Sequence, residues 1–139
     1  VPTPDVQQRL LAVLQDNERT KALQHQPYSM VSYAWGKKYQ QSNQWALETL
    51  ALAMESKTIR TRDQAQAWLQ FKGYEPTALK LGPLTRMGGR VGSANIAFDD
   101  HPSEKRFSDR IETVTVDSVL AWMQRTQLTP APVVVLLND

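Results

Sequence analysis

The chain contains no cysteine, and this absence limits its possible fold and chemistry more than any other feature of the sequence. A disulfide framework, a thiolate metal site and a cysteine nucleophile are all excluded within these residues. Papain-like catalysis in its usual cysteine form is therefore excluded as well. The 139 residues suffice for one domain of ordinary size but not for two independent cores, so we expect a single domain over residues 1–139.

The composition is typical of a soluble globular protein, with 41% hydrophobic and 22% charged residues. No stretch approaches the roughly 18 apolar residues that span a bilayer, so we expect no membrane span. The 16 basic residues are dispersed among 14 acidic ones, and the net charge is only +2. A nucleic-acid-binding protein usually concentrates its positive charge, so this pattern argues against nucleic acid as a partner.

The periodicity of apolar residues predicts both helices and strands. Helical spacing predicts helices that begin near Pro4, Asn43, Arg62 and Asp117. Alternating or continuous apolar runs predict short strands at residues 33–39, 94–98, 111–116 and 133–137. Helices come first and a mixture of helices and strands follows, which indicates an α+β fold. We expect three to four helices packed on a small mixed or antiparallel sheet.

Several predicted helices have a recognisable capping residue at their start. Thr61 and Gln64 match the capping-box pattern, and Asp117 is the expected cap of the last helix. Ser42 or Asn43 is expected to cap the helix over residues 43–55. The expected core consists of the large apolar residues of these elements: Trp45, Leu47, Leu50, Trp68, Leu69, Val114, Leu120, Trp122 and residues 133–137.

Hydrogen-bonding side chains gather in the segment YQQSNQW, residues 39–45, where a helix is predicted to begin. A nucleophile is favoured at such a place, because the free N–H groups and the helix dipole stabilise developing negative charge. Ser42 is the candidate nucleophile of this segment. The alternative interpretation is that Ser42 only caps the helix, and both interpretations remain open at this point.

A second cluster of candidate residues is Asp99-Asp100-His101, followed by Pro102. One imidazole beside two carboxylates can supply a base and the group that orients it. The same residues could form half of a metal site, but nothing else in the chain has ligand spacing, and we expect no metal. They could also form an ordinary turn, since Asp and Pro favour turns. His25 lies in a polar loop and is expected to be a solvated side chain.

Three aromatic residues and a lysine occupy every second position in the segment YAWGKKY, residues 33–39. Such a surface could stack bases and hold phosphates in a small nucleic-acid-binding domain. The alternative interpretation is a strand that buries one aromatic face. The glycine-rich residues 88–92 do not match a phosphate-binding loop, because they lack the Gly-Lys-Ser/Thr ending.

Four blocks of sequence carry a resemblance to a known family: YSMVSYAWGKKYQQSNQWALETLALAM, RDQAQAWLQFKGYEPTAL, ANIAFDDHP and RIETVTVDSVLAW. Together they resemble an uncharacterised bacterial family that is known only as a domain of unknown function. The likeness covers nearly the whole chain. It implies that the chain is the C-terminal half of a longer protein, and that this protein is exported, to the periplasm or beyond.

The block YQQSNQWALETL is also similar, more distantly, to the NlpC-type hydrolases, which are circularly permuted papain-like proteins. In that family a catalytic cysteine opens a helix after a tyrosine, and Ser42 takes the place of this cysteine. The resemblance implies a papain-like-related scaffold in which a serine replaces the more acidic and more nucleophilic thiol. The family's catalytic histidine lies on a strand upstream of the nucleophile, which would be outside this chain.

If the scaffold is active, Ser42 is the expected nucleophile and His101 its base. Asp99 or Asp100 would orient the imidazole. The expected substrate-binding set consists of the polar and aromatic neighbours of Ser42, among which the two amide residues would supply oxyanion donors: Tyr39, Asn43, Gln44 and Trp45. No cofactor is expected.

Three functions therefore remain open. The first is a weak serine-type hydrolase, or a catalytically inactive binding module on the same scaffold, for a peptide, a cell-envelope component or a partner protein. The second is a non-enzymatic protein-interaction domain that uses exposed aromatic residues, with the candidates Tyr28, Tyr33, Trp35 and Tyr74. The third is a small nucleic-acid-binding domain.

Overall fold

The computed structural model describes residues 1–80, 97, 99–107 and 110–130. Its helices are α1 (Pro4–Leu14), α2 (Asn17–Ala22), α3 (Ser42–Met54), α4 (Arg62–Phe71), α6 (Ser103–Phe107) and α7 (Val116–Arg125). Two short strands, β1 (Thr77–Lys80) and β2 (Arg110–Thr113), form an antiparallel pair in which Thr77 faces Thr113. The predicted α+β class, with helices and a small antiparallel sheet, is confirmed.

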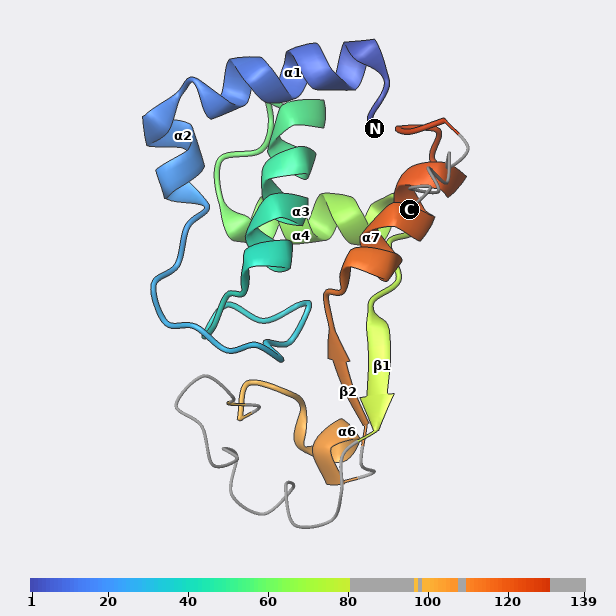
Figure 1. Cartoon of the computed structure of the whole chain (residues 1–139). Coiled ribbons are helices and arrows are strands. Elements are labelled where there is room, and N and C mark those ends of the chain that lie inside the picture. The colour runs from blue at the N-terminus through green and yellow to red at the C-terminus, as the bar shows by residue number, and fades with distance from the viewer. Residues whose placement is uncertain (81–96, 98, 108–109, 131–139) are drawn as a thin grey trace, which may run out of the picture.

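All labelled helices except α6 gather at one end of the molecule, and the two strands extend away from them with α6 at the far end of the strand pair (Figure 1). Helix α1 lies across the C-terminal end of α3 (Figure 1). The irregular segment 23–41 descends beside α3 and loops beneath its first turn (Figure 1). The start of α3 is therefore surrounded by chain that has little regular secondary structure, and this is where the candidate site is found.

The core is built from the apolar faces of α1, α3, α4 and α7. The predicted core residues Leu47, Leu50, Leu69, Val114 and Trp122 are all buried. Edge-to-face ring contacts continue the core toward the strands, with ring centroids 6.0 Å apart for Trp68 and Trp122, 6.1 Å for Trp122 and Tyr74, and 5.8 Å for Tyr74 and Trp35. These contacts place Trp35 and Tyr74 against the core rather than on a free aromatic surface.

Other core predictions need correction. Leu120 is 47% exposed, because α7 buries the face that carries Trp122 and Met123. Trp45 and Trp68 are only half-buried. The predicted core run at residues 133–137 lies outside the described residues.

The predicted strand at residues 33–39 is wrong. Only Tyr33 makes an isolated antiparallel bridge, to Thr113. The chain turns at Gly36, whose N–H donates to the carbonyl of Tyr33 at 3.0 Å. The carbonyls of Gly36 and Lys37 accept hydrogen bonds from the Arg62 side chain, each at 3.2 Å. A side chain therefore satisfies backbone groups that a neighbouring strand would otherwise have paired.

The remaining strand predictions had mixed outcomes. The strand predicted at residues 111–116 is present as β2, but it ends at Thr113 and α7 begins at Val116. The sequence pattern did not predict β1. Of the strand predicted at residues 94–98, only Ala97 lies among the described residues, and it forms a bridge.

Two helix starts test the capping predictions. The capping box of Thr61 and Gln64 is confirmed, with the Gln64 N–H donating to Thr61 Oγ1 at 3.4 Å and the Thr61 N–H donating to Gln64 Oε1 at 3.2 Å. The prediction that Asp117 caps the last helix is wrong. Thr115 caps α7 instead, because its hydroxyl accepts from the Ser118 N–H at 3.2 Å.

Candidate functional site

Ser42 is the first residue of α3 and is exposed to solvent. The residue that precedes the helix is Gln41, which makes no capping hydrogen bond with its side chain. The Gln41 amide instead donates to the hydroxyl of Thr113 at 2.7 Å. The expectation that Ser42 or Asn43 caps this helix is therefore wrong, since both residues lie within the helix and the capping position is occupied by Gln41.

A hollow of about 630 Å³ opens beside Ser42. Segment 24–28 and the start of α3 line it with amide, hydroxyl and aromatic side chains: Gln24, His25, Gln26, Tyr28, Gln40, Gln41, Ser42 and Trp45. Its size lies within the range of small-molecule and cofactor sites, which is roughly 300–1,000 Å³. None of its described lining residues is Asp, Glu, Lys or Arg. The hollow can therefore offer hydrogen bonds and flat aromatic faces, with His25 as its imidazole.

His25 is held in place within the wall of the hollow. Its backbone N–H donates to Gln40 Oε1 at 2.8 Å, and its ring atom Nε2 lies 3.0 Å from the carbonyl oxygen of Lys38. Because a carbonyl can only accept, Nε2 carries the proton in the neutral ring and Nδ1 carries the lone pair. The expectation of a solvated His25 holds in part, since the ring lines an open hollow and its contact with Lys38 is exposed, but the residue as a whole is half-buried and bonded.

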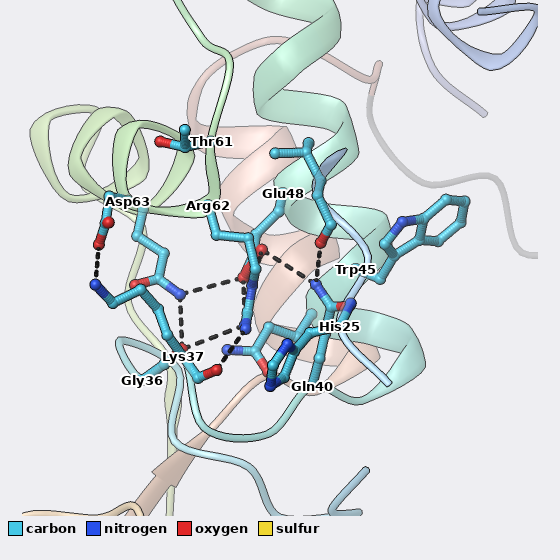
Figure 2. A network of polar contacts seen from close by, with 12 residues as sticks. His25, Gly36, Lys37, Gln40, Trp45, Glu48, Thr61, Arg62 and Asp63 are labelled. Carbon is cyan, nitrogen blue, oxygen red and sulfur yellow. Dashed lines mark hydrogen bonds and ion pairs between the residues drawn. The ribbon is translucent and has the colours of Figure 1, made fainter. Parts of the chain in front are cut away.

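Gln40 connects the hollow to the interior of the protein (Figure 2). Its side chain is almost fully buried, and its Nε2 donates to the carbonyl of Leu23 at 2.8 Å and to Glu48 Oε2 at 3.2 Å. Its backbone N–H donates to the carbonyl of Pro27 at 2.9 Å. Gln40 therefore binds segment 23–27 at three points, counting the contact of its Oε1 with His25.

The interior end of this connection is an ion pair between Glu48 and Arg62, whose side chains are 1% and 8% exposed. Arg62 Nε lies 2.8 Å from Glu48 Oε2, and Arg62 Nη2 lies 3.0 Å from Glu48 Oε1. The Gln66 amide also donates to Glu48 Oε1, at 3.2 Å. Burial raises the pKa of Glu48, and the hydrogen bonds and charge of Arg62 oppose that rise.

Arg62 also binds the loop that precedes α3 (Figure 2). Besides the carbonyls of Gly36 and Lys37, its guanidinium donates to the carbonyl of Tyr39 at 3.3 Å. Gln66 adds a hydrogen bond to the Gly36 carbonyl at 2.9 Å. Residues 36–40 thus depend on α3 and α4 for their conformation.

The second predicted cluster occupies a different part of the structure, where residues 99–101 meet the loop of residues 29–33. His101 is 4% exposed, and its Nε2 lies 2.6 Å from the carbonyl oxygen of Val31. Asp100 Oδ2 accepts from the Tyr33 N–H at 2.8 Å, and Asp100 Oδ1 lies 3.7 Å from His101 Nε2. Burial raises the pKa of Asp100, against the opposing effect of the Tyr33 N–H.

The structure therefore brings Asp100 and His101 together, but it places Ser42 in the hollow that His25 lines. Asp99 forms an ion pair with Lys38 on the surface between the two regions. The catalytic pairing of Ser42 with His101 stays a prediction.

The four residues expected to bind substrate also differ in position. Trp45 lines the hollow. Tyr39 is buried, and its carbonyl is bound by Arg62. The buried Gln44 amide is used inside the protein, where it accepts from Ser32 Oγ at 2.7 Å and donates to the Tyr33 carbonyl at 3.0 Å. Asn43 donates to Gln41 Oε1 at 3.4 Å. Of the four, Trp45 is the residue that faces the candidate site.

Sequence reasoning missed Gln40, Glu48 and Arg62, and it undervalued His25. One signal was available for Glu48, which stands between Leu47 and Leu50 on the apolar face of a predicted helix. A carboxylate at such a position is rarely buried unless it is paired.

A metal site and a membrane-spanning helix can both be assessed for the part of the chain that the structure describes. There, no three His, Cys, Asp or Glu side chains are grouped so that they could hold a metal ion. Nor does any helix among the described residues have the length and apolar character needed to cross a membrane.

Comparison with known proteins identifies a family. The model of a family described as an uncharacterized protein conserved in bacteria, DUF2145, matches residues 1–123. The expected resemblance to an uncharacterised bacterial family is thereby confirmed. No curated protein and no solved structure matches the chain significantly. The likeness to NlpC-type proteins and the position in a longer chain stay predictions.

Proposed function

The chain belongs to DUF2145, a family of uncharacterised bacterial proteins, and we propose that it is a binding module whose site is the hollow beside Ser42. The observation that carries the proposal is the lining of this hollow. Four glutamines line a space of about 630 Å³ together with Tyr28, Trp45, Ser42 and His25. Convergent polar groups in a concave space of this size are the usual property of a ligand site.

The lining indicates a ligand of neutral charge. The exposed residues Gln24 and Gln26 offer amides that both donate and accept hydrogen bonds, as the N–H and C=O groups of a peptide backbone do, whereas the Gln40 and Gln41 amides are bonded inside the protein. Tyr28 is 43% exposed, and with Trp45 it offers an apolar surface for small side chains. The described lining has no lysine or arginine to neutralise phosphates, which argues against nucleic acid. A short, uncharged, extended peptide satisfies these requirements best.

The resemblance to papain-like proteins supports the same proposal. In that resemblance Ser42 takes the position of the catalytic cysteine, and the hollow would then be what remains of the substrate cleft. A serine without the acidity of a thiol can keep the binding function while losing most of the catalytic rate. Export would make a cell-envelope peptide the natural ligand.

A peptide titration tests the binding proposal. The probe is a tetrapeptide of glycine, alanine and serine, capped at both ends, and the same peptide with two glutamates or two lysines serves as the charge control. Titration calorimetry should show saturable binding of the neutral peptide. The substitution Tyr28→Ala should weaken binding by about fivefold or more, because exposed aromatic residues often dominate such contacts.

Phe71→Ala is the matched control for that variant, because Phe71 is 82% exposed and lies at the end of α4. Its affinity for the peptide should equal that of the wild type. Absence of saturable binding, or an equal loss in both variants, would contradict the proposal.

A second candidate function is a weak serine-type hydrolase, and it is favoured by the presence of Ser42 and His25 in one hollow. Ser42 Oγ would attack an acyl carbon, the His25 imidazole would take the hydroxyl proton and pass it to the leaving group, and water would release the acyl group. A fluorophosphonate reagent distinguishes the two functions. Covalent labelling located at Ser42 by mass spectrometry, and absent from Ser42→Ala, would favour the hydrolase. Unlabelled protein that still binds the neutral peptide would favour the binding module.

A further inference from the structure

We propose that Glu48 is a positioning residue for the hollow, and that it acts through Gln40. The inference rests on the proposed binding function for its consequence, but its structural part can be tested without any ligand. Glu48 does not line the hollow; Gln40 does. The two side chains are joined by the hydrogen bond from Gln40 Nε2 to Glu48 Oε2 at 3.2 Å (Figure 2).

The first step of the argument is that both oxygens of Glu48 are fully used. Oε2 accepts from Arg62 Nε and Gln40 Nε2, and Oε1 accepts from Arg62 Nη2 and Gln66 Nε2. Four donors from three side chains therefore converge on one carboxylate. A neutral amide of the same size offers a single acceptor oxygen, and its NH₂ group would face donors. Only a carboxylate satisfies this arrangement.

The second step is that stability alone is a weak explanation for burying this ion pair. The desolvation of two charges offsets much of their attraction, and apolar pairs of similar volume are often as stable or more stable. What the ion pair adds here is a fixed conformation of the segment 36–40. The segment 36–40 has no helix or strand of its own, and Arg62 and Gln66 bind its carbonyls while Glu48 holds both of these side chains.

The third step is that the two walls of the hollow meet at Gln40. Its side chain binds the carbonyl of Leu23 and the N–H of His25 on one wall, and its own backbone leads into Gln41 and Ser42 on the other. The hydrogen bond to Glu48 acts together with the one to the Leu23 carbonyl to orient the Gln40 amide, so that Nε2 points inward and Oε1 points at His25. The distance between the walls thus depends on a carboxylate that a ligand in the hollow does not touch.

The test is Glu48→Gln, with Glu55→Gln as the matched control, because Glu55 is exposed at the end of the same helix and the same charge is lost. The ligand-free readout is hydrogen exchange at the His25 N–H, compared with the amide of Leu50 in the core. In Glu48→Gln the His25 amide should exchange about tenfold faster. The Leu50 amide should change its exchange rate only as much as the change in the free energy of global unfolding requires. The affinity for the capped neutral peptide should fall by about tenfold. Glu55→Gln should change neither.

A role in stability alone would accelerate exchange of both amides by the same factor, and that result would overturn the proposal. So would a folded Glu48→Gln protein with unchanged exchange at His25. If Glu48→Gln fails to fold, the double variant Glu48→Leu/Arg62→Leu replaces it, because an apolar pair removes the buried charges together. Its His25 amide should show the same selective acceleration. If the wild type binds no peptide, the proposed function fails, and the exchange result still decides the positioning role.

Discussion

Two carboxylate side chains are buried among the described residues, Glu48 and Asp100, and they differ in almost everything except their burial. The side chains of Glu48 and Asp100 are 1% and 2% exposed, and burial raises the pKa of both groups. Glu48 lies on a long helix and accepts four hydrogen bonds, two of them from a guanidinium. Asp100 lies on a turn, where one oxygen accepts a backbone N–H and the other accepts no hydrogen bond from the described residues.

This difference shows how a fully charged partner stabilises a buried carboxylate. Arg62 brings a compensating charge into the interior with Glu48, so the pair forms a fixed junction between α3, α4 and the loop before α3. In the described part of the chain, the group that can carry a positive charge near Asp100 is the His101 imidazole, whose Nε2 is 3.7 Å from Oδ1 and closer to a carbonyl. We expect the Glu48 cluster to act as a structural anchor, and the Asp100 cluster to respond to pH.

The largest effect should come from removing the guanidinium. Arg62→Leu leaves Glu48 buried without its counter-charge and removes three hydrogen bonds to backbone carbonyls, so the free energy of unfolding should fall by about 3–5 kcal/mol. Chemical denaturation measures this change. Arg60→Leu is the control, because Arg60 is exposed and lies two residues earlier; it should change stability by less than about 0.5 kcal/mol. Equal effects of Arg62→Leu and Arg60→Leu would mean that the Glu48 cluster is not a structural anchor, and its contrast with the Asp100 cluster would not hold.

The helical part of this fold could be predicted from the sequence because its signals are local. Apolar residues recur at helical spacing in α3 and α4, and the Thr61–Gln64 capping box marks where α4 begins. The start of α3 was also located correctly to within a residue. Its cap was not, because Gln41 occupies the capping position while its amide bonds to Thr113, far away in the sequence.

The candidate site could be predicted only in part, because the contacts that shape it are not local. Ser42 and Trp45 were found, since they stand together at a helix start. Glu48 is 14 residues from Arg62 and 18 from Gln66, and no periodicity relates such positions. The same network explains the false strand at residues 33–39, where alternation of side chains carries no information about which group binds the carbonyls.

A smaller effect is expected at the second carboxylate, and it should depend on pH. A raised pKa in the folded state means that the folded protein holds the Asp100 proton more tightly than the unfolded chain does. The stability from this group is present below the unfolded pKa and is lost as pH rises through the folded pKa. Asp100→Asn keeps an acceptor for the Tyr33 N–H and does not titrate, so this part of the pH dependence should vanish.

Denaturation of both proteins between about pH 3.5 and 7 measures the difference, since the unperturbed value lies near 3.9. Wild-type stability should decline relative to Asp100→Asn as pH rises. His101, Asp99 and Tyr33 also face Asp100 and influence its charge, so the comparison concerns the cluster as a whole. Parallel pH curves for the two proteins would show that folding does not change the pKa of Asp100, and the expected response of this cluster to pH would then be wrong.

The smallest effect is expected where the two clusters meet. Lys38 belongs to the loop that Arg62 holds, and it forms an ion pair with Asp99, the neighbour of Asp100. Burial is the largest single influence on the Asp99 carboxyl and raises its pKa, but the hydrogen bonds from Lys38, Tyr39 and the backbone, together with the charge of Lys38, outweigh it and lower the pKa overall. A lowered pKa contributes stability above the unfolded value, and this contribution is lost as pH falls through the folded value.

Lys38→Met should therefore lower the melting temperature slightly at neutral pH, and the difference should shrink in acid and in high salt, because the pair is exposed. Lys37→Met is the control, since Lys37 is about as exposed as Lys38 but pairs with the more exposed Asp63 of α4 instead of Asp99. The two substitutions should have similar effects. A much larger effect of Lys38→Met, persisting in high salt, would mean that the two clusters form one cooperative unit, and the contrast between an anchored and a titrating carboxylate would then not hold.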